Sequence, residues 1–174
     1  MGIQFETDYN METLTAMAKG LRKTVRKKRS RRVHIFAAVV LILGLLTILA
    51  TTAGGEPLGA SGVVTLLAML VVILVSLFED KLNAWFARKR LLPGTEHAVA
   101  TFEEDGYVSA TSMSESKFSY AQIVAVAETA RYFVFALSSH HTQAYDKRTI
   151  RGGSVEDFRA FIAEKTGKPI ANIK

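Results

Sequence analysis

Few residues in this chain have the types and spacing that catalysis or metal binding requires. His140 and His141 are adjacent. Neighbouring residues on a strand point to opposite faces, so these two would not readily share one metal ion. The acidic run Glu103-Glu104-Asp105 has ligands for a cation, although a solvated hairpin tip explains it more simply. We expect both clusters to lie in exposed turns.

The sequence lacks the common catalytic signatures. It contains no Gly-x-Ser-x-Gly elbow, no His-Glu-x-x-His motif and no Gly-x-x-x-x-Gly-Lys-Ser/Thr phosphate loop. It also contains no cysteine, which excludes disulfides and cysteine catalysis. We therefore expect a protein that is not an enzyme and that uses no cofactor and no metal ion.

Lys147 and Arg148 are the best candidates for a binding role. They lie at the end of an expected strand, where they would meet lipid headgroups or the acidic surface of a protein partner. A solvated hairpin end is the alternative. Glu79 and Asp80 lie at the edge of an apolar run. Acids inside a membrane suggest an ion pathway, but acids at its edge more often face water.

Two long apolar runs organise the elements that must position these residues. The first, residues 33–53, would form a helix about 31 Å long, which matches the hydrocarbon core of a bilayer. The second covers residues 63–78, and its helix can begin near residue 58. The link 54–62 contains Gly54-Gly55-Glu56-Pro57, a helix-breaking cluster. We predict two antiparallel transmembrane helices joined by an external turn, rather than buried helices of a soluble protein.

The distribution of lysine and arginine predicts the orientation of this hairpin. The net charge of +6 divides into +6 for residues 1–32, +1 for 33–93 and −1 for 94–174. Positive charge favours the cytoplasmic side, so we predict a multi-pass protein of the cytoplasmic (inner) membrane with both termini inside. An anionic leaflet explains the basic segment better than nucleic acid, which is not an expected partner. The juxtamembrane basic residues are Arg22, Lys23, Arg26, Lys27, Lys28, Arg29, Arg31 and Arg32.

Short segments flank the hairpin on its basic side. Residues 3–7 alternate as a strand does. This strand is too short to stand alone, and the C-terminal sheet is its candidate partner. An amphipathic helix is expected from Met11, capped by Asn10. This helix would either lie in the headgroup layer or extend the first transmembrane helix into the cytoplasm. Residues 79–92 are expected to be a helical extension of the second span, with Trp85 as an anchor at the membrane interface.

After Pro93-Gly94 the sequence changes from long apolar runs to short strand-like segments, which marks a cytoplasmic domain over residues 95–174. Ser154 and Asp157 predict the capped start of a C-terminal helix. We expect a membrane α-hairpin followed by an α+β domain, with an antiparallel sheet or half-barrel closed by that one helix. The strands are expected near residues 98–102, 107–111, 117–120, 123–128, 132–137 and 143–147.

Several short motifs make the chain resemble the YcxB-like family of bacterial membrane proteins. They are Phe102-Glu103-Glu104-Asp105-Gly106, Tyr120-Ala121-Gln122-Ile123, Glu128-Thr129, Tyr145-Asp146-Lys147-Arg148 and Asp157-Phe158. Members typically have an aromatic residue, often tryptophan, where Tyr120 stands. They have Pro-Lys-Arg where this chain has Asp146-Lys147-Arg148, so Asp146 departs from the family pattern. The resemblance implies an N-terminal strand, two membrane helices and a cytoplasmic domain similar to bacterial pleckstrin-homology (PH) domains. It implies no established activity.

Three functional hypotheses follow. The leading one is a non-enzymatic, membrane-anchored interaction module that binds a protein partner or lipid headgroups. The second is an immunity-type or stress-protective membrane protein. The third is a homo-oligomeric transporter or channel, although the spans offer few polar residues beyond Thr47, Thr51, Thr65 and Ser76. Small residues in both spans would allow close helix packing, within the hairpin or between copies of the chain.

Overall fold

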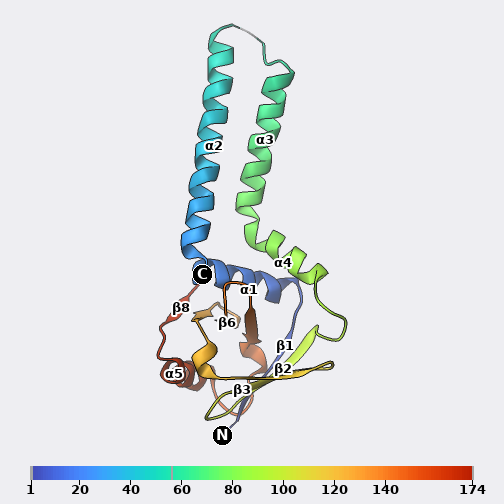
Figure 1. Ribbon diagram of the computed structural model, residues 1–174, viewed down its shortest axis with the longest axis vertical. Helices are drawn as coiled ribbons and strands as arrows, with labels where there is room; N and C mark the ends of the chain where they lie inside the picture. The colour runs from blue at the N-terminus through green and yellow to red at the C-terminus, as the bar shows by residue number, and fades with distance from the viewer. Residues whose placement is uncertain (1, 56, 174) are drawn as a thin grey trace.

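The computed structural model describes residues 2–55 and 57–173, so Glu56 of the expected turn lies outside the described residues. Its elements form three layers along the long axis of the molecule (Figure 1). A helical hairpin forms one end, two short helices lie across the base of that hairpin, and a domain of two small sheets forms the other end. The strands nearest the N-terminus and the C-terminus both belong to this domain.

The hairpin consists of α2 (Lys27–Ala53) and α3 (Ala60–Leu77). Their mean hydropathy reaches 2.7 and 2.6, and no residue of either helix is buried. A core helix of a soluble protein would be covered by other elements, whereas these helices expose apolar side chains along their length. Both are long and apolar enough to cross a membrane, which fits the predicted hairpin.

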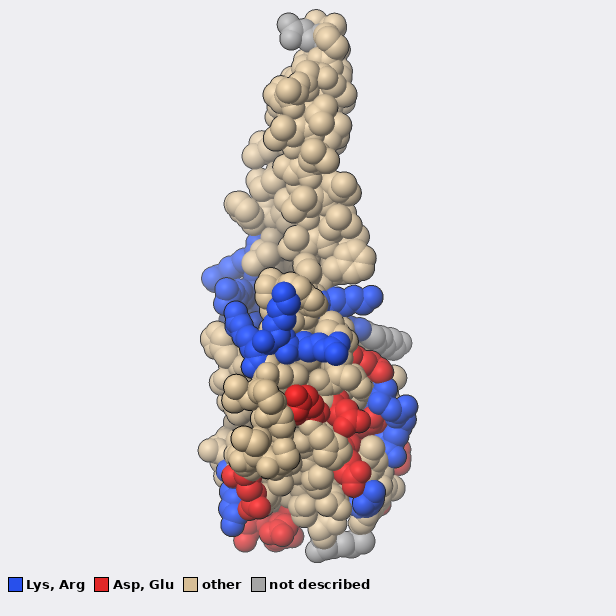
Figure 2. Space-filling view, turned by 90° about the vertical axis from the view of Figure 1, so that its right-hand side faces the viewer, with Lys and Arg blue, Asp and Glu red and all other residues tan. Residues whose placement is uncertain are grey.

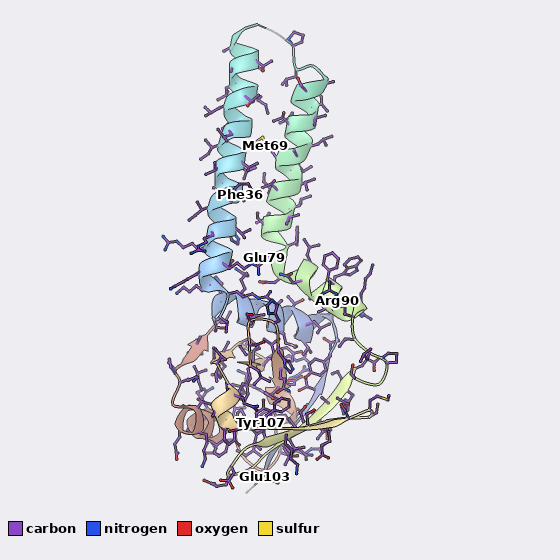
Figure 3. All side chains as sticks on the ribbon, in the orientation of Figure 1. Phe36, Met69, Glu79, Arg90, Glu103 and Tyr107 are labelled. Carbon is purple, nitrogen blue, oxygen red and sulfur yellow. The ribbon has the colours of Figure 1, made fainter. Side chains whose placement is uncertain are left out.

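The two helices pack closely at one small residue. The Met69 side chain points from α3 toward α2 (Figure 3), and a Cβ atom on Gly44 would lie 2.8 Å from the Met69 sulfur. The hydroxyls of Thr47 and Thr65 donate to the carbonyls of Leu43 and Ser61 in their own helices. These hydroxyls are therefore satisfied without a partner helix or a water-filled path.

The short helices at the base are α1 (Met11–Lys23) and α4 (Glu79–Lys89), which we call the platform. The Asn10 side chain accepts hydrogen bonds from the backbone amides of Glu12 and Thr13, as expected of a helix cap. Residues 24–26 form a turn between α1 and α2. The structure thus contradicts the alternative in which this segment continues the first membrane helix.

The apolar stripe of α1 faces the domain and α4. Leu14, Ala16 and Leu21 are buried, and α1 packs against α4 and β6. A Cβ atom on Gly20 would lie 2.7 Å from a methyl carbon of Val134, so glycine allows this close approach. The stripe is thus covered by protein. A stripe pattern records which face is buried, and it cannot show whether lipid or protein buries it.

The domain contains two four-stranded sheets rather than one meander. The first has the order β1 (Ile3–Asp8), β2 (His97–Phe102), β3 (Tyr107–Thr111) and β4 (Glu115–Phe118), all antiparallel. The second has the order β7 (Thr142–Asp146), β6 (Tyr132–Ala136), β5 (Ala125–Glu128) and β8 (Ile170–Asn172). It is mixed, because β8 runs parallel to β5. The strands expected from the sequence did not include β8.

The strand before the hairpin completes the first sheet. β1 pairs with β2 from Ile3 opposite Phe102 to Asp8 opposite His97. The folded domain therefore includes residues 3–8 together with the segment after residue 95, and the N-terminal strand joins the C-terminal part of the chain in one sheet.

Two expected strands end earlier than predicted because side chains cap short helical turns. Ser119 begins the turn η1 (Tyr120–Gln122), so Tyr120 is not in a strand. Asp146 accepts a hydrogen bond from the backbone amide of Arg148 and begins the turn η2 (Lys147–Thr149). The departure from the family pattern at Asp146 thus serves a local cap.

The helix α5 (Val155–Thr166) closes the space between the sheets. Ser154 and Asp157 form the predicted capping box, and Gly167 ends the helix with a φ of +62°. The ring of Phe158 lies 4.6 Å from that of Phe5 and 5.1 Å from that of Phe133, so strands of both sheets meet this helix. The predicted α+β domain with a C-terminal helix is therefore confirmed, whereas the structure has one antiparallel and one mixed sheet in place of the predicted antiparallel sheet.

Candidate functional site

One charged contact fixes the platform at the base of the hairpin. Arg22 of α1 donates from Nε and Nη2 to the two carboxylate oxygens of Asp80, at 2.7 and 2.6 Å. Glu79 lies 3.8 Å from the same guanidinium. The hydrogen bond to Asp80 raises the pKa of Arg22 above its ordinary value. Asp80 and Glu79 therefore serve a contact between α1 and α4, whereas the sequence suggested that they face water.

An open groove lies on one side of α1, with a volume of about 930 Å³. It is mostly apolar, with charged residues among its lining, and its size falls within the range of ligand pockets. We call it the platform groove. Its lining comprises Met11, Glu12, Thr15, Ala16 and Lys19 of α1, Lys81 of α4, residues 128–132 around the β5–β6 turn, Lys147, Asn172 and Ile173.

Lys147 lines this groove as part of an internal ion pair. Its Nζ donates to Glu128 at 3.0 Å and to the carbonyl of Thr129 at 2.6 Å, and its side chain is only 13% exposed. Arg159 also donates to Glu128, at 2.9 and 2.8 Å. The hydrogen bonds from Arg159 and Lys147 lower the pKa of Glu128 to about 2, so this carboxylate is ionised at neutral pH. The charge of Lys147 is therefore neutralised by an ion pair within the domain.

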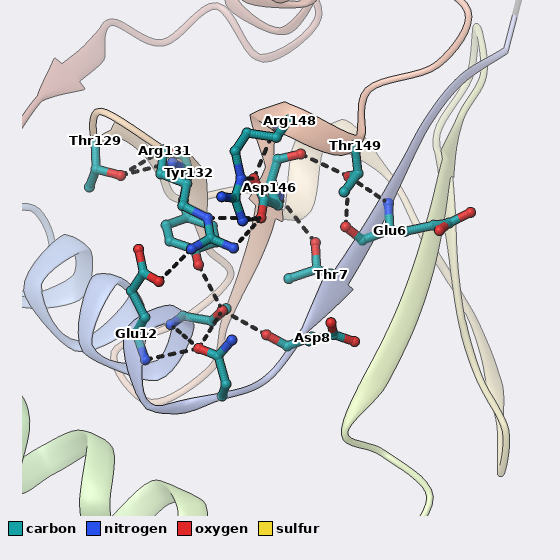
Figure 4. Close-up of polar contacts among 12 residues, drawn as sticks. Glu6, Thr7, Asp8, Glu12, Thr129, Arg131, Tyr132, Asp146, Arg148 and Thr149 are labelled. Carbon is teal, nitrogen blue, oxygen red and sulfur yellow. Dashed lines mark hydrogen bonds and ion pairs between the residues drawn. The ribbon is translucent and has the colours of Figure 1, made fainter.

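Arg148 points elsewhere, beside Asp146 (Figure 4). Asp146 accepts hydrogen bonds from Arg131 at 2.9 and 2.7 Å and from Arg148 at 3.1 Å. Arg131 also pairs with Glu12 of α1, which ties the β5–β6 turn to the platform. Because Arg148 remains 65% exposed while Lys147 is covered, the two residues do not form one basic surface. A contact through Arg148 alone stays a prediction.

The predicted juxtamembrane basic residues surround the neck between the hairpin and the domain, where Lys and Arg gather in Figure 2. Arg22 makes the contact with Asp80, and Nε of Arg26 donates to the carbonyl of Ser139 at 2.6 Å. The exposed members are Lys23, Lys27, Lys28, Arg29, Arg31 and Arg32.

Trp85 of α4 is 44% exposed. Its ring meets the ring of Phe86 edge to face at 4.9 Å, and Nζ of Lys89 lies 3.6 Å from its centroid. An exposed tryptophan beside a lysine at the end of a span suits the membrane interface. Its role as an anchor stays a prediction.

The remaining candidate clusters lie in turns. His140 and His141 are exposed between β6 and β7, and residues 103–105 are exposed between β2 and β3. Glu104 pairs with Lys165 of α5, and this contact lowers the pKa of Glu104. Within residues 2–55 and 57–173, no three His, Asp or Glu side chains gather as metal ligands.

Sequence reasoning missed the groove and the Arg22–Asp80 contact. Both depend on α1 packing beside α4, although the whole hairpin separates these helices in the chain. One signal was available: a basic residue beside the α1 stripe and two acids directly after the second apolar run could neutralise each other. The groove itself left no signal, since Lys19 and Lys81 resemble other juxtamembrane lysines.

Comparison with known proteins bears on the domain. Residues 102–162 match a family model described as YcxB-like protein. The match runs from the end of β2 into α5 and includes the motifs at Tyr120 and Tyr145, so the resemblance is confirmed there. A search of curated proteins and a search of solved structures gave no match.

Proposed function

We propose that this chain, which is YcxB-like over residues 102–162 and has two helices apolar enough to span a membrane, is a membrane-anchored interaction module without catalytic activity. The hairpin is its anchor, and the platform groove takes a short segment of a protein partner. The observation that carries this proposal is the groove, a mostly apolar hollow beneath the hairpin. The Arg22–Asp80 contact supports it by holding the groove in a fixed place.

The charges at the groove indicate the chemistry of that segment. Glu12 is paired with Arg131, and Glu128 is paired with Lys147 and Arg159. Lys19 and Lys81 have no ion pair among the described residues. The groove thus offers apolar surface with a net positive edge, which suits an apolar segment that carries acidic residues.

Location and fold detail belong to the same proposal. The protein would lie in the cytoplasmic membrane with both termini inside. The basic neck supports this orientation, since Lys and Arg favour the cytoplasmic side. A PH-like architecture is supported by two sheets packed around a C-terminal helix.

Site-specific photocrosslinking in native membranes tests the groove. A photoreactive residue replaces Thr15, which lines the groove, and a control probe replaces Ser116 on the exposed strand β4. The proposal expects one protein to crosslink from position 15 and not from position 116. That partner, once identified and purified, should then bind the full chain directly.

Paired charge variants show whether the groove itself makes the contact. Lys19→Gln with Lys81→Gln should abolish the crosslink. Lys23→Gln with Arg88→Gln removes the same charge from α1 and α4 outside the groove lining and should leave it intact. Crosslinks to lipid alone, or equal crosslinking from both probe positions, would overturn the proposal.

A further inference from the structure

A second hollow lies on the other side of α1, at the base of the membrane helices. Its volume is about 700 Å³, and it is enclosed by α1, the first turns of α2, α4 and the β6–β7 turn. We call it the basic recess, because arginines from three segments line it. Only Glu79 among its described lining residues is acidic, and that carboxylate lies beside Arg22. The recess and the platform groove have no lining residue in common.

The arginines of the recess are largely available for a ligand. Arg26 precedes α2, Arg29 lies in its first turn and Arg90 follows α4. None of the three forms an ion pair within the described part of the chain. Arg26 uses one donor on the carbonyl of Ser139, and a guanidinium has five. Such groups match the oxygens of a phosphate in number and geometry.

Part of the recess lining is apolar and adjoins the hairpin. Val33, where the first apolar run begins, and Phe86 of α4 line it, together with Leu21 of α1. Glu79 and Arg90 mark the two ends of α4 beneath the membrane helices in Figure 3. A ligand held here would have its charge among arginines and its apolar part beside lipid-facing helices. Soluble anions lack that second part.

We propose that the basic recess binds an anionic phospholipid through its phosphate, in the leaflet next to the domain. The phosphate would accept hydrogen bonds from Arg29 and Arg90, and the first acyl carbons would lie against Val33 and Phe86. Basic hollows between membrane helices on the cytoplasmic side suit such headgroups. This lipid site is distinct from the proposed partner site in the platform groove.

The single tryptophan of the chain provides a direct measurement. Trp85 touches Phe86, which lines the recess, so a lipid bound there brings its acyl chains close to the indole. The full chain is reconstituted in phosphatidylcholine nanodiscs with a minor fraction of phosphatidylglycerol. Tryptophan fluorescence is measured in two samples, one with bromine on the acyl chains of phosphatidylglycerol and one with bromine on those of phosphatidylcholine. Brominated phosphatidylglycerol should quench more strongly than its share of the bilayer predicts.

Matched double variants separate a site from a general attraction. Arg29→Gln with Arg90→Gln should reduce the apparent affinity for phosphatidylglycerol about tenfold or more, because two charged hydrogen-bond donors are lost. Arg31→Gln with Arg88→Gln removes equal charge from the same segments but outside the recess lining, and it should retain most of the preference. Circular dichroism confirms that both variants are folded.

Two results would overturn the lipid site. Equal losses in both double variants would mean a diffuse basic collar, and unchanged quenching in both would mean no role for these arginines. Neither result would affect the crosslinks expected from position 15, so the failure of one proposal is distinguishable from the failure of the other.

Discussion

At the scale of single residues, two carboxylates determine what the basic side chains after β7 can do. Glu128 and Asp146 are only 8% and 7% exposed, yet each accepts hydrogen bonds from two cationic side chains. A buried carboxylate is costly unless it is paired and hydrogen-bonded. Lys147 therefore contributes to folding, which explains why a lysine that suggested a contact surface in the sequence is covered in the structure.

Replacing Glu128 tests whether its ion pairs with Lys147 and Arg159 stabilise the folded domain. Glu128→Gln is expected to lower the free energy of unfolding by roughly 2–3 kcal/mol, because two charged partners lose their acceptor. The pKa of Glu128 is about 2 in the folded chain against an ordinary value of 4.5. Its stabilisation is thus fully present above about pH 5 and is lost as the pH falls toward 2. Chemical unfolding of the full chain in detergent should show a larger difference from wild type at pH 7 than at pH 3.

Glu156→Gln is the matched control for that measurement. Glu156 lies 3.6 Å from the same Arg159, but its side chain is 76% exposed. Exposed pairs contribute little, so this variant should unfold nearly as the wild type does. Equal destabilisation by the two variants would contradict the role assigned to the buried carboxylate.

At the scale of elements, α1 is shared between the membrane hairpin and the domain. One part of its surface receives Val134 of β6 at Gly20, and another packs along α4. Arg22 adds a bidentate contact to Asp80 at the edge of this packing. The position of the domain relative to the hairpin thus depends largely on α1, with a further contact from Arg26 to the carbonyl of Ser139.

Loss of the Arg22–Asp80 contact should loosen the platform without unfolding the domain. Asp80→Asn is expected to increase hydrogen exchange of the backbone amides in α1 and α4 and to leave α5 unchanged. Glu79→Gln should have a smaller effect, because Glu79 is 3.8 Å from the guanidinium. Exchange followed by mass spectrometry in nanodiscs measures both. Faster exchange throughout α5 in the Asp80 variant would show that the contact supports the whole fold instead.

Gly20→Ala tests whether α1 is docked as closely as the structure shows. Helix propensity alone would make alanine better by about 1 kcal/mol. The added Cβ would lie 2.7 Å from Val134, and such overpacking costs about 1–3 kcal/mol. We expect a lower unfolding midpoint in detergent. In a Val134→Ala background the same change should be neutral or stabilising. An alanine that stabilises the wild-type chain would mean that α1 does not pack on β6.

The sequence predicted the elements that depend on neighbouring residues. The two apolar helices, the Asn10 cap and the Ser154–Asp157 capping box are each encoded within a few turns, and the structure confirms them. Pairings between distant segments left no comparable pattern. β8 has three residues, and its parallel pairing with β5 depends on the course of α5. The platform groove could not be predicted from the sequence either, because its walls come from five separate parts of the chain.

At the scale of the whole molecule, labelling of single introduced cysteines tests the predicted orientation across the membrane. The chain has no cysteine, so single cysteines report on one position each. Gly59→Cys lies in the turn, where an added Cβ meets nothing within 4 Å, and Ser116→Cys lies on exposed β4. In intact cells an impermeant maleimide should label position 59 and not position 116. Lysis should make both reactive, and the reverse pattern would place the domain outside.

The pairing of β1 with β2 also constrains how the protein is made. The first strand leaves the ribosome before either membrane helix, while its partner begins at His97, after both. Phe5 therefore cannot be enclosed until Phe102 and Phe158, which pack against it, have been synthesised. Completion of the first sheet thus follows synthesis of the hairpin. A fragment that begins after α4 would lack β1 and the buried Phe5 of its own core.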